Sequence, residues 1–262
     1  MGKQDEVAPA GQVVRDHRVE VAEKKRIVMR ARLVDATMRV IGDAGNSAPV
    51  IDDVIREAKV SRGTFYNYFN TLDDVLALIG HELNDQMTTE ILPIYDMLTV
   101  PWQRFAVGFR VFLVRAMFDH KWAGFVTRTD AWNQDTLVDK YMGKDLADGK
   151  AAGQFFFDDL QVAKDFLKGA NLLGIRTIRQ GVDDPIAYIN AAVIMAFASQ
   201  GCSRERCEEG AAFSSAHLRE WGRGELAAGR PPWALNINSK QGRLFAGLVG
   251  APEKKQRAGR QS

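Results

Sequence analysis

The stretch VSRGTFYNYF, residues Val60–Phe69, joins a polar opening to a strongly aromatic end. The opening is typical of an exposed segment, and the aromatic end is typical of a buried one. With Ser61 as the N-cap and about 100° of turn per residue, Phe65 and Phe69 fall on the same face of a helix. The stretch therefore predicts a short helix that is anchored by two phenylalanines and keeps its other face exposed.

A second short helix is expected directly before this one. Four apolar residues recur there at helical spacing: Ile51, Val54, Ile55 and Ala58. Only the dipeptide Lys59-Val60 breaks the pattern before Ser61, and two helices joined so closely form a helix-turn-helix. In this motif the second helix presents its polar face to the DNA major groove. Gly63 lets DNA approach the backbone, and the hydroxyls of Tyr66 and Tyr68 can contact phosphates.

Residues 32–80 resemble the DNA-binding domain of the TetR family of transcriptional regulators. RLVDATMRVIGDAG resembles the first helix of that domain, and VIDDVIREAKVSRGTFYNYFNTLDDVL resembles its helix-turn-helix and the start of its fourth helix. The resemblance implies that Arg62, Gly63, Thr64 and Asn67 contact bases, whereas Tyr66 and Tyr68 contact phosphates. It also implies an all-α fold, with a three-helix DNA-binding domain followed by a helical ligand-binding and dimerisation domain.

Three positions depart from the pattern usual in that family. Lys59 stands where a glycine is usual, Leu72 where a lysine is usual, and Val50 where a threonine is usual. Two habitual phosphate contacts are therefore not expected. The basic residues Lys24, Lys25 and Arg26 form a possible arm that reaches the DNA backbone or the minor groove. The alternative is that they belong to a long, solvated first helix.

Helical patterns fill most of the chain, and no run alternates with the period of a strand. In the first helix, five apolar residues recur at steps of four and three: Ile27, Ala31, Val34, Met38 and Ile41. Asp184-Pro185 and Ser203 are start signals for two late helices. Four parts are predicted: a disordered tail (1–18), the helix-turn-helix domain (19–80), a helical effector-binding and dimerisation domain (81–230), and a loosely packed C-terminal extension (231–262).

Aromatic residues are concentrated between Trp102 and Phe166. Core packing explains any one of them, but their density favours a cavity for an apolar or aromatic ligand. The candidate pocket residues are Trp102, Phe109, Phe112, Trp122 and Phe125. One of Arg115, Arg128 and Asn171 can add an orienting polar contact.

Small residues line up on the helix expected from Pro185 to Gln200. Such a row lets a second helix approach closely, and the next helix adds further candidates. The predicted homodimer interface contains Ala187, Ala191, Ala198, Ala211 and Leu218. The alternative is an internal helix pair within a monomer.

Composition and motifs exclude several other classes of protein. Basic residues outnumber acidic ones by only two, and the longest apolar run, AAVIMAFA, is too short to span a membrane. We expect no signal peptide, no metal, no cofactor and no membrane partner, and a cytoplasmic location. The segment HELND (His81–Asp85) lacks the second histidine of a zinc-protease helix, and Cys202 and Cys207 match no metal or redox motif.

The sequence thus predicts a sequence-specific, DNA-binding transcriptional regulator that acts as a homodimer on a palindromic operator. We expect a repressor that a small, largely apolar effector releases from DNA. The alternatives are a TetR-like helical interaction protein without DNA binding and, from a different class, a small-molecule enzyme, although no catalytic residue is expected. Binding of a palindromic DNA fragment distinguishes the first reading from both alternatives.

Overall fold

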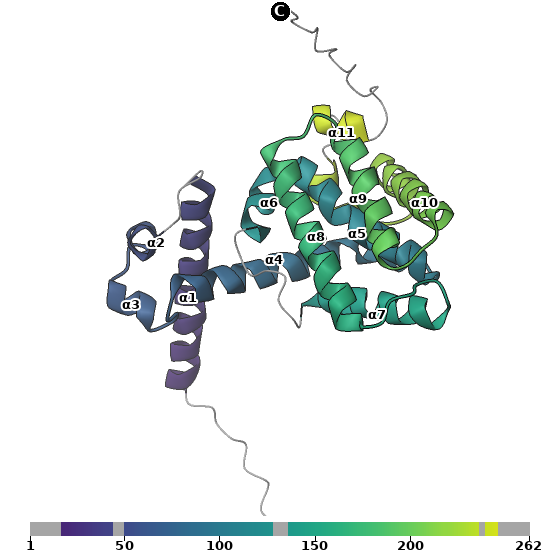
Figure 1. Cartoon of the computed structure of the whole chain (residues 1–262). Helices are drawn as coiled ribbons and strands as arrows, with labels where there is room; N and C mark the ends of the chain where they lie inside the picture. The colour runs from purple at the N-terminus through teal and green to yellow at the C-terminus, as the bar shows by residue number, and fades with distance from the viewer. Residues whose placement is uncertain (1–16, 44–49, 128–135, 236–238, 246–262) are drawn as a thin grey trace, which may run out of the picture. The chain divides into compact units, whose positions relative to one another are not determined.

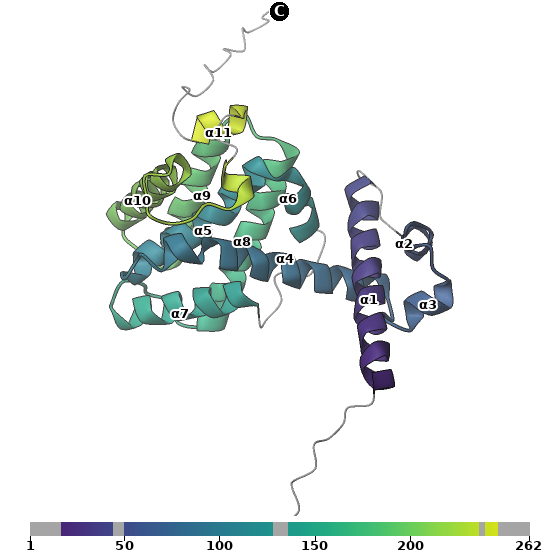
Figure 2. The same ribbon diagram turned by 180° about the vertical axis from the view of Figure 1, so that it is seen from behind.

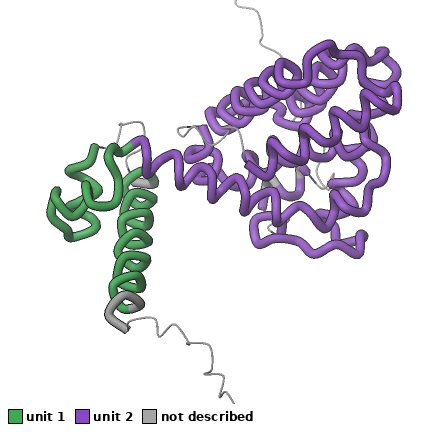
Figure 3. Tube along the Cα trace, turned by 90° about the horizontal axis from the view of Figure 1, so that it is seen from below, with its two compact units in different colours: residues 1–72 green, residues 73–262 purple. Residues whose placement is uncertain are grey.

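The structure is a computed structural model that describes residues 17–43, 50–127, 136–235 and 239–245 of the 262-residue chain. All regular elements in these ranges are helical, which confirms the predicted all-α class (Figures 1 and 2). The chain forms two compact units, Met1–Leu72 and Asp73–Ser262 (Figure 3). Most of the expected N-terminal tail, and Arg128, lie outside the described residues.

Unit 1 contains three helices: α1 (His17–Asp43), α2 (Ile51–Ala58) and α3 (Arg62–Tyr66). Helix α1 packs against α2, and its buried residues are Leu33, Ala36, Thr37 and Ile41. The apolar face predicted for this helix is therefore wrong in part, because Ile27 is 59% exposed. The true inward face begins at Leu33, and the preceding turns of α1 extend into solvent.

Unit 2 is a bundle around one central helix. It contains α4 (Leu72–Tyr95), α5 (Pro101–Phe118), α6 (His120–Val126), α7 (Leu137–Ala151), α8 (Leu160–Gln180), α9 (Pro185–Ser199), α10 (Arg204–Arg223), η1 (Pro232–Leu235) and α11 (Lys240–Phe245). Helix α5 packs against α7, α8, α9 and α10 (Figure 1). Its side chains from Phe105 to Met117 are almost all buried. The start signals are confirmed at α9 and α10, since Asp184 caps Ala187 N–H and Ser203 caps Arg206 N–H.

The segment after α10 returns to the bundle. The Trp233 indole N–H donates to Glu90 at 2.9 Å, and Ala234 and Phe245 are buried. The Phe245 ring contacts Phe118 of α5 at 5.6 Å between centroids. These residues are therefore part of unit 2 rather than a loosely packed extension.

Candidate functional site

Helix α3 is built on the two predicted anchors. Phe65 is fully buried, Phe69 is 6% exposed, and their ring centroids are 6.0 Å apart. The Ser61 hydroxyl accepts the Thr64 N–H at 3.0 Å, which confirms Ser61 as the N-cap. The helix ends at Tyr66 and not at Phe69, although the Phe69 N–H still reaches the Phe65 carbonyl at 3.1 Å. The exposed face that the sequence predicts for this stretch is thus formed by about one and a half turns of helix and by the turn that follows it.

The outward face of α3 carries the residues expected to contact DNA. Arg62, Gly63, Tyr66 and Asn67 are exposed, while Thr64 and Tyr68 are half-buried. A Cβ atom added to Gly63 would meet only the Ser61 hydroxyl, at 3.8 Å. Internal packing therefore does not require a glycine here, and the open space is available to a closely approaching partner.

Two of these candidates already have partners within unit 1. The Arg62 guanidinium lies 2.5 Å from an Asp52 carboxylate oxygen on α2, and this hydrogen bond raises the pKa of Arg62. The Thr64 hydroxyl shares a hydrogen bond with the Ser61 hydroxyl at 2.8 Å. Thr64 therefore offers its methyl group more readily than its hydroxyl, whereas Arg62 keeps further N–H donors besides the one that pairs with Asp52.

The turn between α2 and α3 contains the unusual residue Lys59. Its φ of 53° places it in the left-handed region, and its N–H caps α2 through the Arg56 carbonyl at 3.2 Å. A residue with a side chain adopts this conformation at a cost of about 1–2 kcal/mol. A glycine at this position would avoid that cost.

The possible basic arm lies on the solvent-facing part of α1. Lys24, Lys25 and Arg26 are all exposed and precede the first buried residue, Leu33. Arg30 instead lies over the Phe69 ring, 5.7 Å from its centroid. The arm remains a prediction, because an exposed basic helix end suits both DNA contact and simple solvation.

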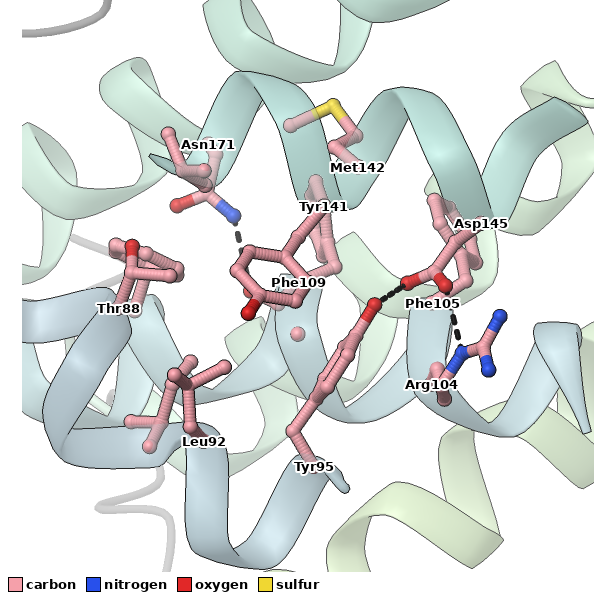
Figure 4. Close-up of a pocket in the computed structure, with 14 residues that line it drawn as sticks. Thr88, Leu92, Tyr95, Arg104, Phe105, Phe109, Tyr141, Met142, Asp145 and Asn171 are labelled. Atoms are coloured by element: carbon pink, nitrogen blue, oxygen red, sulfur yellow. Dashed lines mark hydrogen bonds and ion pairs between the residues drawn. The ribbon is translucent and has the colours of Figure 1, made fainter. Parts of the chain in front are cut away.

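Unit 2 contains a largely apolar cavity of about 50 Å³ among α4, α5, α7 and α8 (Figure 4). Five aromatic side chains line it: Tyr95, Phe105, Phe109, Phe112 and Tyr141. The predicted pocket residues Phe109 and Phe112 are among them, but Trp102, Trp122 and Phe125 do not line it. Trp102, for example, packs against Phe213 at 5.3 Å between ring centroids.

A buried polar network forms one end of this cavity (Figure 4). The Tyr95 hydroxyl donates to one oxygen of Asp145, and the Arg104 guanidinium donates to the other at 2.7 Å. Arg104 also reaches Asp148 at 3.0 Å. Burial raises the pKa of Asp145, whereas Tyr95 and Arg104 act in the opposite direction. Tyr95, Arg104 and Asp145 lie on three different helices, so no local sequence pattern predicted this network.

The other end of the cavity holds Asn171 of α8. Its side-chain N–H donates to the Phe109 carbonyl at 2.9 Å, and its side-chain oxygen has no hydrogen-bond partner. Asn171 is one of the three polar candidates predicted from the sequence, and it lines the cavity. Arg115 does not: it is buried between the Trp122 and Trp233 rings and donates to Glu90 at 3.1 Å.

The predicted interface residues separate into two groups. Ala187, Ala191 and Ala198 are exposed on α9, but Ala211 and Leu218 are buried in the core of their own unit. Ala211 and Leu218 therefore offer no free surface to a partner. A row of exposed apolar side chains on α8 was not predicted; it contains Val162, Phe166 and Leu173.

The described residues contain few signs of other chemistry. His81 and Asp85 lie 3.3 Å apart on α4, but no cluster of three metal-binding side chains was found in these ranges. None of the described helices is both long enough and apolar enough to cross a membrane.

Fold and site together define a helix-turn-helix domain followed by an all-α domain with an internal cavity. Residues 33–79 match the sequence model of a family described as bacterial regulatory proteins, tetR family. The HTH-type transcriptional regulator BetI of Burkholderia thailandensis is 39% identical over 61 residues, or 23% of this chain. The match spans only 31% of BetI, about a third of its length. The N-terminal domain is therefore similar in sequence to the DNA-binding domain of tetR-family regulators.

Solved structures resemble a larger part of the chain. RolR in complex with resorcinol has a TM-score of 0.56 and 20% identity, over 72% of this chain and 95% of RolR. RolR without ligand has the same TM-score and 22% identity, over 70% of this chain and 96% of RolR. At these identities the likeness shows that the two-part helical fold is shared.

Proposed function

We propose that this protein is a sequence-specific DNA-binding transcriptional regulator that reads the major groove with α3. The observation that supports this most directly is the exposed face of α3, held over the buried Phe65 and Phe69. It lies within the segment that matches the family. We assign base contacts to Arg62, Gly63, Thr64 and Asn67, and phosphate contacts to Tyr66 and Tyr68.

We further propose that a small effector binds in the cavity of unit 2 and releases the protein from its operator. RolR has been solved with resorcinol, an aromatic diol, and five aromatic side chains line the cavity here. At about 50 Å³ the cavity is smaller than an apolar cavity of ~150 Å³ that accepts benzene. A ring-containing effector must therefore displace side chains, and the half-buried, unbranched Met142 is well suited to move. Release follows when the effector prefers the conformer that binds DNA less well.

A homodimer completes the proposal, because two copies of α3 would read two half-sites of a palindrome. The exposed Ala187, Ala191 and Ala198 of α9 support an interface at this face. Ala212 and Ala216 of α10 replace the buried Ala211 and Leu218 as candidates, since both are exposed beside the groove between α9 and α10.

The substitution Ala191→Arg is expected to convert the dimer into a monomer. A long charged side chain would prevent close approach of the two helices and would be costly to bury. Light scattering of the wild type and the variant measures the mass directly. The matched control is Ala147→Arg on α7, also exposed, which should leave the dimer intact. A monomeric wild type would end the proposal.

The substitution Asn67→Ala is expected to cost about 1–3 kcal/mol on the preferred operator and to relax sequence preference, because a base contact is lost. Tyr68→Phe should instead weaken binding to all sequences alike, since a phosphate contact carries no sequence information. Operators are selected from random duplex, and affinities for selected and random DNA are compared across salt concentrations.

Gln180→Ala, at an exposed position of α8, is the control and should change neither affinity nor preference. Unchanged specificity in Asn67→Ala would contradict the assignment of α3 as the reading helix. If the wild type prefers no sequence, the alternative of a helical interaction protein is favoured.

A further inference from the structure

We infer that the effector donates a hydrogen bond to the side-chain oxygen of Asn171, and that it is a neutral, hydroxylated ring compound. This inference rests on the proposed function only in taking the cavity of unit 2 as the effector site. It excludes a pure hydrocarbon and a carboxylate as the preferred ligand.

The orientation of the Asn171 amide is fixed by its surroundings. Its N–H group donates to the Phe109 carbonyl at 2.9 Å, and a flipped amide would place two oxygens against each other. The side chain is 3% exposed, and its oxygen is buried without a partner. A buried acceptor that lacks a donor is unfavourable, so a molecule that supplies a donor gains affinity from this position.

The remaining charged groups of the cavity are already paired with each other. Asp145 accepts from Tyr95 and Arg104, and Arg104 also donates to Asp148. Arg104 is the one cation among the described residues that line the cavity, and it faces two carboxylates. An anionic ligand would therefore find no free cation and would lie near the Asp145 carboxylate.

The side chains around Asn171 favour a ring. Phe109 and Phe112 line the cavity beside it, and the Tyr141 ring lies between Asn171 and Tyr95 in the close-up (Figure 4). The Asn171 oxygen has no exposed surface in the unenlarged cavity of about 50 Å³. A ring compound that displaces the surrounding side chains would bring its hydroxyl to this oxygen.

The test compares phenol with toluene, which has nearly the same shape but no donor, and with benzoate. Calorimetric titration of the full chain should show phenol binding about tenfold tighter than toluene, as expected for one additional hydrogen bond. Asn171→Leu should lower the affinity for phenol by about tenfold, and it should leave the affinity for toluene unchanged or raise it. Benzoate should bind neither protein.

The Asn171→Leu variant keeps a side chain of similar size. It does not leave the Phe109 carbonyl without a donor, because this carbonyl lies in the interior of α5 and accepts a backbone N–H of the helix. The matched control is Met142→Leu, which changes the cavity wall without removing a hydrogen bond and should affect phenol and toluene alike. Equal affinity for phenol and toluene in the wild type would overturn the inference. So would an unchanged ratio in Asn171→Leu, or binding of neither probe.

A second titration separates this inference from the proposed function. Selected operator DNA is added to the protein with and without bound phenol. If phenol shows the Asn171-dependent preference but leaves DNA affinity unchanged, the recognition chemistry stands and the proposed release mechanism fails. If a ligand without a donor releases the DNA while phenol does not, the release mechanism stands and the inference about Asn171 is wrong.

Discussion

Phe65→Ala is expected to unfold the helix-turn-helix and abolish sequence-specific DNA binding. Phe65 is fully buried, and its ring contacts the rings of Tyr66 and Phe69. Removing a buried phenylalanine side chain costs about 3–5 kcal/mol, because apolar burial is lost and a cavity remains. A small domain is stable by only ~5 kcal/mol in total, so this one change removes most of the stability of unit 1.

Circular dichroism during thermal unfolding measures this effect, together with operator binding at the same temperatures. The control is Tyr66→Ala on the same helix, since the Tyr66 side chain is 47% exposed. It should weaken DNA binding while changing stability by less than about 1 kcal/mol. A Phe65→Ala protein that melts like the wild type would show that the phenylalanine is not the anchor of α3.

Arg104→Met is expected to destabilise unit 2 by about 3 kcal/mol at neutral pH. The Asp145 side chain is only 4% exposed and would keep only the Tyr95 hydroxyl among the donors described. Breaking a buried ion pair from one side leaves an uncompensated charge, which is more costly than the pair was favourable. Chemical denaturation of the wild type and the variant measures the difference in free energy of unfolding.

The pH dependence of this loss has a definite sign. Burial already raises the pKa of Asp145, and loss of Arg104 raises it further. The penalty is therefore fully present above the folded-state pKa and shrinks as the pH falls and the carboxyl is protonated. The triple variant Arg104→Met, Asp145→Leu, Tyr95→Phe removes the charge and both donors, and should recover most of the stability. A constant loss at all pH values would refute this explanation.

Local signals in the sequence were sufficient for three helix starts. Ser61, Asp184 and Ser203 were identified as caps from their residue type and position, and each accepts the expected backbone N–H. The end of α3 was not predicted, because the aromatic spacing continues to Phe69 while Asn67 ends the helix. The predicted inward face of α1 differs from the observed one, because two sets of apolar residues overlap on that helix. Packing against α2 determines which set is buried.

An apolar cavity was predictable from the sequence, but its position was not. A high density of aromatic residues indicated an apolar site, yet the space arises only where the side chains of four helices fail to fill the bundle. Tyr95 and Asp145 are 50 residues apart in the chain, and no local pattern connects them. Asp145 and Asp148 do share one face of α7, and this spacing was a usable signal for the partner of Arg104.

Small residues alone did not distinguish an interface from a core. Ala187 and Ala211 have the same side chain, but the first faces solvent and the second packs inside unit 2. A helix that packs against both its own unit and a partner carries small residues on two faces. The pattern of small residues therefore does not show which face is exposed. The burial of each residue in the folded unit does.

The short helix η1 has an unusual place in the order of unfolding. Segments that few contacts hold commonly open first. Here Trp233 donates to Glu90, packs edge-on against Trp221 and contacts Arg115 through its ring face, so lifting η1 would expose a largely buried ion pair and two indole rings. The Ala234 amide hydrogen, which donates to the Pro231 carbonyl, should therefore exchange as slowly as the amides of the bundle that η1 covers.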